Sequence, residues 1–177
     1  MKFEYIYLLD GNFHPDSKVW IYQSSRLFSV SEALQIEQMM DDFVRTWMSH
    51  GAPVKGAAHL FFGQFIILMA DETATGVSGC STDSSVHLIK QIEKSFGVDM
   101  FDRMTFAVIV KDKSGEDCIQ LLPMAQVRYA IDQGFVSAET LYFNNLVQSK
   151  EELEKNWIIP LKDSWLAKRI SFEKSLS

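Results

Sequence analysis

The chain has 177 residues, of which 47% are hydrophobic and 12% aromatic, which is ordinary for one globular domain with a substantial core. Its formal net charge of −6 argues against a nucleic-acid partner, because such a surface needs an excess of lysine and arginine. The sequence contains no run of 18 apolar residues and its N-terminus lacks a signal-peptide pattern, so we expect no membrane association.

The two cysteines, Cys80 and Cys118, form neither a disulfide framework nor a zinc motif. Two reduced thiols are typical of cytoplasmic proteins, and we expect this location. The histidines also lack the spacing of metal ligands, so we expect no metal and no cofactor; they are His14, His50, His59 and His87.

The first predicted strand covers residues 19–23, where aromatic and β-branched residues are concentrated. Ser29 and Glu32 have the spacing of a capping box, which predicts the start of a helix. Apolar residues then recur at helical spacing, and Gly51 indicates a C-terminal cap. We therefore predict a helix over about 30–50.

Two apolar runs, 57–62 and 65–70, flank Gly63-Gln64 and predict a hairpin with a type II′ turn. The second run does not alternate, so we expect a central strand that is covered on both faces. A helix should follow over 83–96. The remaining predicted elements are a strand over 104–110, its hairpin partner over 118–121, a helix from Pro123 to Gly134, a short strand over 140–143 and a short helix after Ser149.

The order strand–helix–strand–strand–helix–strand over residues 19–110 matches the split β-α-β-β-α-β pattern. We therefore predict a single α+β domain over residues 1–177, with an antiparallel or mixed sheet of about five strands. Residues 111–177 should form a helical C-terminal extension.

The chain resembles an uncharacterised bacterial family over about residues 19–170, through the segments 19–26, 47–51 and 78–85. Members are sometimes described as ABC transporter ATPases, and residues 65–72 are similar to a Walker B strand. We do not expect nucleotide hydrolysis, because an ATPase needs a phosphate cradle of the form GxxxxGK[ST]. In residues 51–58 the lysine precedes the second glycine instead of following it.

Residues 77–85 place a thiol, several hydroxyls and a carboxylate just before the predicted helix. A helix N-terminus lowers the pKa of a thiol and attracts anions. The candidate catalytic residues are therefore Cys80, Ser81 and Asp83, with His59 and His87 as candidate bases. The candidate contacts to a small anionic ligand are Arg26, Ser78, Gly79 and Thr82.

A purely structural role competes with this interpretation, because serine, threonine and aspartate gather at helix starts to cap N–H groups. Two functions stay open. The first, which we prefer because no convincing catalytic set is present, is a non-catalytic binding or assembly protein with a protein partner or a second copy. The second is a small enzyme or anion-binding protein centred on Cys80, Ser81 and Asp83.

Overall fold

The fold is that of a computed structural model, which describes residues 3–49, 51–71 and 79–172, without the side chains of residues 79–82. The described residues form two compact units. The N-terminal unit lies within Glu4–Asp102 and Asn145–Glu154, and the C-terminal unit within Arg103–Asn144 and Lys155–Ser177, together with Phe3. Four α-helices and three antiparallel sheets occur in this part of the chain, which confirms the α+β class.

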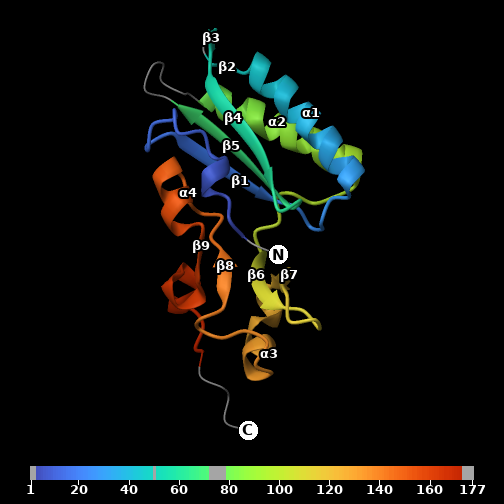
Figure 1. The fold of residues 1–177 in the computed structure, drawn as a ribbon, viewed down its shortest axis with the longest axis vertical. Helices are drawn as coiled ribbons and strands as arrows, with labels where there is room; N and C mark the ends of the chain where they lie inside the picture. The colour runs from blue at the N-terminus through green and yellow to red at the C-terminus, as the bar shows by residue number, and fades with distance from the viewer. Residues whose placement is uncertain (1–2, 50, 72–78, 173–177) are drawn as a thin grey trace. The chain divides into compact units, whose positions relative to one another are not determined.

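The N-terminal unit is built on a three-stranded antiparallel sheet (Figure 1). Its strand order is β1 (Lys18–Gln23), β5 (Phe65–Asp71) and β4 (Lys55–Phe61). All seven residues of β5 are buried. The structure therefore confirms the predicted central strand that is covered on both faces.

Two helices, α1 (Val30–Thr46) and α2 (Gly79–Phe96), lie side by side over one face of this sheet (Figure 1). Successive strand residues point to opposite faces, so every second residue meets the helices. The core on this side contains Trp20, Tyr22, Ala58, Leu60, Ile66 and Leu68 from the strands, and Ile36, Met40, Ile89 and Ile92 from the helices. The other face is covered by Tyr5 and Phe13 from the N-terminal segment, which contact Phe61 and Lys55.

The predicted capping box at the start of α1 is confirmed. The Ser29 Oγ accepts a hydrogen bond from the Glu32 N–H at 3.3 Å, and the Ser29 N–H donates to Glu32 Oε2 at 2.7 Å. The helix ends at Thr46, earlier than predicted. Gly51 instead occupies the turn between two short strands, β2 (Met48–Ser49) and β3 (Ala52–Pro53), where its φ is 80°.

The turn between β4 and β5 also differs from the prediction. Phe62 and Gly63 have φ angles of 55° and 63°, and the Gln64 N–H donates to the Phe61 carbonyl at 3.1 Å. Positive φ at both central positions is the signature of a type I′ turn, not of type II′.

Helix α2 begins at Gly79, four residues before the predicted start. Cys80, Ser81 and Thr82 therefore belong to the first turn of the helix instead of preceding it. Ser78 lies outside the described residues. The helix ends at Phe96, as predicted, and Gly97 follows with a φ of 61°.

The C-terminal unit contains a four-stranded antiparallel sheet and the short helix α3 (Val127–Asp132). Its strand order is β7 (Asp117–Pro123), β6 (Thr105–Lys111), β8 (Leu141–Phe143) and β9 (Ile158–Pro160). Pro123 is the last residue of β7, so it does not start the helix as predicted.

The strands thus divide among separate sheets instead of forming one sheet of about five strands. Both edges of β5 are occupied by β1 and β4. The outer edge of β1 is also taken, because the Val19 N–H donates to the Gln148 carbonyl at 2.9 Å and Lys18 bridges Ser149. Residue 149 precedes the fourth helix, α4 (Lys150–Asn156). Strand β6 pairs with β7 and β8 instead.

Among the described helices, none combines the length and the apolar character that crossing a bilayer requires.

Candidate functional site

A pocket of about 770 Å³ lies in the N-terminal unit between α1, α2 and the start of β2. Pockets of several hundred Å³ are the usual size for small organic ligands. Its apolar wall is formed by Met39, Phe43, Trp47, Met48 and Leu88. The pocket therefore offers both a suitable volume and apolar surface for a small molecule.

Trp47 is the most deeply buried aromatic residue in this wall, with 2% of its surface exposed. Its ring lies 4.8 Å from the ring of Phe43 and 6.0 Å from that of Trp20, measured between centroids. Gly56 on β4 makes room for the ring, because a Cβ at that position would lie 2.5 Å from Trp47 Cε3. The absence of a side chain at Gly56 thus fixes where this wall of the pocket sits.

The indole N–H of Trp47 is buried and has no hydrogen-bond partner among the described residues. A buried donor without an acceptor costs about 1–3 kcal/mol. This donor belongs to a side chain that lines the pocket.

The polar lining of the pocket is acidic. Asp42 on α1 and Asp83 on α2 contribute carboxylates, and no lysine or arginine lines the pocket in the part of the chain that the structure describes. Arg45 lies outside the lining but contacts Asp42, with 2.8 Å between Nη2 and Oδ1. Asp83 thus adds a negative charge to the pocket lining.

Two of the sequence-predicted site residues, Asp83 and His87, line this pocket together. They are four residues apart on α2, which places them on one helical face. The Nε2 atom of His87 lies 3.3 Å from Nε2 of Gln91, one turn further along.

The other predicted residues of this helix turn have only their backbone described. Gly79, Cys80, Ser81 and Thr82 form the first turn of α2, at the same end as Asp83. Their side-chain positions lie outside the described residues, as does Ser78 altogether. Their proposed roles therefore stay predictions.

His59 is separated from this pocket by the sheet. On β4 it alternates with Ala58 and Leu60, which pack against the helices, so its ring points to the opposite face. The ring stacks on Phe61, with centroids 5.3 Å apart, and burial lowers the pKa of His59. The structure thus does not bring His59 and His87 together.

Arg26 lies at the other end of α2. Its guanidinium donates to both carboxylate oxygens of Glu32, at 2.8 and 2.9 Å, and to the Phe96 carbonyl at 2.7 Å. At 1.5 Å per residue, Phe96 is roughly 24 Å along the helix from Cys80. Arg26 therefore joins the start of α1 to the end of α2, and it is distant from the predicted anion site.

The Arg26 contact also changes the acidity of its partner. Hydrogen bonds from Arg26, and next from the Ser29 backbone, lower the pKa of Glu32 to about 2. Glu32 is thus ionised throughout the neutral range and holds both the helix cap and the arginine.

Residues 65–71, the described part of the segment that is similar to a Walker B strand, end in a carboxylate that an ion pair explains. Asp71 is the last residue of β5, is 5% exposed, and lies 2.8 Å from Lys55 Nζ on the paired strand. Glu72 lies outside the described residues. The ion pair accounts for the buried carboxylate without a bound nucleotide or metal.

Sequence reasoning missed Trp47 and Asp42 as pocket residues. Trp47 continues the apolar stripe of α1, which indicated a core residue, and nothing in its spacing marks the unsatisfied N–H. Gly56, directly before the apolar run 57–62, was the available signal, since glycine in a strand often marks a close approach.

Among the described residues, no three His, Cys, Asp or Glu side chains come close enough to hold a metal ion together. No protein-family model matches the chain, and no curated protein or solved structure matches it significantly. The family resemblance therefore stays a prediction.

Proposed function

We propose that this chain is a non-catalytic binding protein that takes a small organic ligand in the pocket between α1 and α2. The observation that carries the proposal is a pocket of ligand size whose apolar wall also holds the polar groups of Asp83, His87 and Gln91. A few polar groups within apolar walls are the usual pattern of ligand sites.

The histidines support a binding role over a catalytic one. A catalytic base is normally oriented by an acidic or carbonyl partner and lies beside a nucleophile. His87 instead lies beside the amide of Gln91, and His59 is on the far face of the sheet.

The test is whether a neutral aromatic probe, N-phenyl-1-naphthylamine, binds in this pocket. Gln91→Phe places a bulky ring in the lining, whereas Lys90→Phe changes the adjacent exposed residue, which does not line the pocket. We expect saturable probe fluorescence with the wild type and Lys90→Phe, and a loss of at least tenfold in affinity with Gln91→Phe. Equal binding by both variants, or no saturable binding by the wild type, would contradict the proposal.

The second candidate, a thiol-dependent enzyme or an anion-binding protein, is supported by one observation. Asp83 and His87 line the pocket, and Cys80 precedes them at helical spacing of three and seven residues. All three positions therefore share one face of α2.

Alkylation with iodoacetamide across a pH series tests this candidate. Cys118→Ser leaves Cys80 as the one thiol, and Cys80→Ser is the matched control. The enzyme candidate predicts half-maximal reactivity of Cys80 clearly below the ordinary thiol pKa of about 8.5. A thiol that reacts only above this value, or not at all in the folded chain, argues against it.

A further inference from the structure

A half-buried histidine, His59, lies on the sheet face opposite α1 and α2. It lies between Phe61 and Lys55, two β4 residues on the same face that the N-terminal segment, here residues 4–17, contacts. The Nε2 atom of His59 is buried and has no hydrogen-bond partner among the described residues. The ring stacks on Phe61 at an interplanar angle of 19°. This environment favours a neutral imidazole, because the burial of Nε2 disfavours the charged ring.

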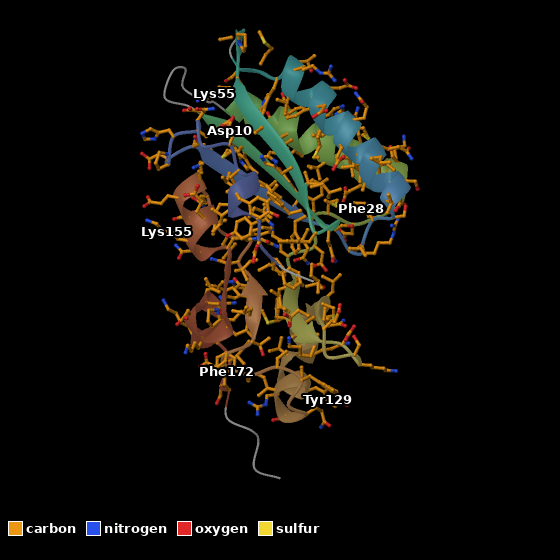
Figure 2. The ribbon with its side chains drawn as sticks, viewed as in Figure 1. Asp10, Phe28, Lys55, Tyr129, Lys155 and Phe172 are labelled. Carbon is orange, nitrogen blue, oxygen red and sulfur yellow. The ribbon has the colours of Figure 1, made fainter. Side chains whose placement is uncertain are left out.

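The N-terminal segment covers this face through side chains that are buried. Tyr5 and Phe13 are each exposed by no more than 6%, and the Tyr5 ring packs edge-on against Phe61 at 5.9 Å. Lys55 fastens the same segment, because its Nζ donates to the Asn12 carbonyl at 2.6 Å and lies 4.9 Å from the Phe13 ring. Figure 2 shows Lys55 beside the segment that carries Asp10.

The charged and titratable groups around His59 do not supply a full counter-charge. Asp10 favours the charged ring, but burial outweighs this effect and lowers the pKa of His59. Lys55 and Asp71 share the sheet face and neutralise each other at 2.8 Å. Other titratable groups near this segment have partners of their own: Tyr5 donates to the Leu153 carbonyl, Lys150 and Glu154 of α4 pair with each other, and His14 lies beside Asp16 on the segment itself.

We propose that His59 makes the N-terminal segment an acid-sensitive cover, which opens from the sheet face when the imidazole becomes protonated. Opening hydrates the ring and releases Tyr5 and Phe13 from the face, whereas α1 and α2 stay in place on the other side of the sheet. The device is reversible, because deprotonation restores the preference for the closed arrangement.

The expected size of the effect follows from linkage between protonation and opening. In the open state His59 has the ordinary histidine pKa of about 6.5, whereas the closed state resists protonation. Each pH unit below about 6.5 therefore multiplies the opening constant by up to tenfold, until the closed state also becomes protonated. Above pH 6.5 the opening constant is independent of pH.

Hydrogen exchange of the full chain at pH 7.5, 6.5 and 5.5, corrected for intrinsic rates, measures this opening. The reporting amides are hydrogen-bonded within the segment: Leu8, Leu9, Phe13 and Ser17. We expect their protection to fall by up to about tenfold between pH 6.5 and 5.5 while the amides of α1 keep theirs. Protection that does not change with pH, or that falls equally in α1, would overturn the proposal.

Two variants separate His59 from other acid effects. His59→Gln keeps a neutral polar side chain at every pH, so the loss of protection should disappear. His14→Gln is the matched control, because His14 belongs to the same segment and its side chain is 49% exposed; this variant should behave as the wild type. If His59→Gln still loses protection at pH 5.5, or if His14→Gln no longer does, the proposal is overturned.

A direct titration covers the case in which His59→Gln does not fold. Proton NMR of the wild type should show the ring of His59 titrating below the ordinary histidine pKa of about 6.5. If the ring of His59 titrates at or above this value, the proposal is wrong.

Discussion

Replacing Gly56 by alanine should disturb the deepest wall of the pocket. The added Cβ would lie 2.5 Å from Cε3 and 2.9 Å from Cζ3 of Trp47, well inside van der Waals contact. The indole has little freedom to retreat, because Phe43 and Trp20 pack against it. Backbone strain does not contribute, since Gly56 lies in β4 and its φ is not positive.

The magnitude follows from two opposing effects. Overpacking a tight core costs about 1–3 kcal/mol. The same change restricts the unfolded chain and returns about 0.4–1 kcal/mol. We therefore expect Gly56→Ala to lower the free energy of unfolding by about 1–2 kcal/mol. Trp47 should also move, which would change the tryptophan fluorescence of the folded state.

Urea denaturation followed by circular dichroism measures the free energy, with Gly11→Ala as the control. A Cβ at Gly11 would meet no atom within 4 Å, so that variant should stay within about 0.5 kcal/mol of the wild type. If Gly56→Ala is as stable as Gly11→Ala and its fluorescence is unchanged, the Trp47 ring does not pack tightly against Gly56. Gly56 would then not set the position of this pocket wall.

Three further predictions concern contacts in the same unit. Ser29→Ala removes the N-cap of α1 and should cost about 1 kcal/mol in urea denaturation. Lys55→Met leaves buried Asp71 without its ammonium partner and should cost about 1–2 kcal/mol by the same measurement, since the half-exposed ammonium is partly screened. Hydrogen bonds from Arg26, and next from the Ser29 backbone, lower the pKa of Glu32 from 4.5 to about 2. This stabilising contribution is therefore full above pH 4.5 and is lost as the pH falls towards 2, and a pH series of thermal melts should show a smaller loss with Glu32→Gln.

Features set by short-range interactions were predictable from the sequence. The capping box of α1 depends on two side chains three residues apart, and the structure contains it as predicted. The continuous apolar run of β5 likewise indicated burial on both faces. Asp83 and His87 share a face of α2 because their spacing matches the helical repeat.

Features set by long-range competition were not predictable. Gly51 has a positive φ, which suits a helix cap and a hairpin turn equally. It lies in a turn because β2 pairs with β3. The division of strands among sheets depends on which edges remain open, and residues 148–149 close the edge of β1 from far along the chain. The separation of His59 from His87 depends on which face of the sheet α2 covers.

The burial of β5 also has a consequence for how the chain is made in the cell. Residues 65–70 are six consecutive apolar residues without a charge or a proline, a combination that is prone to ordered aggregation when it is unshielded. Helix α2, which completes the cover of this stretch, is translated after it, so a ribosome-bound intermediate displays the stretch before its cover is complete. Expression yield should therefore depend on chaperone supply and growth temperature more strongly than the equilibrium stability of the finished protein would suggest.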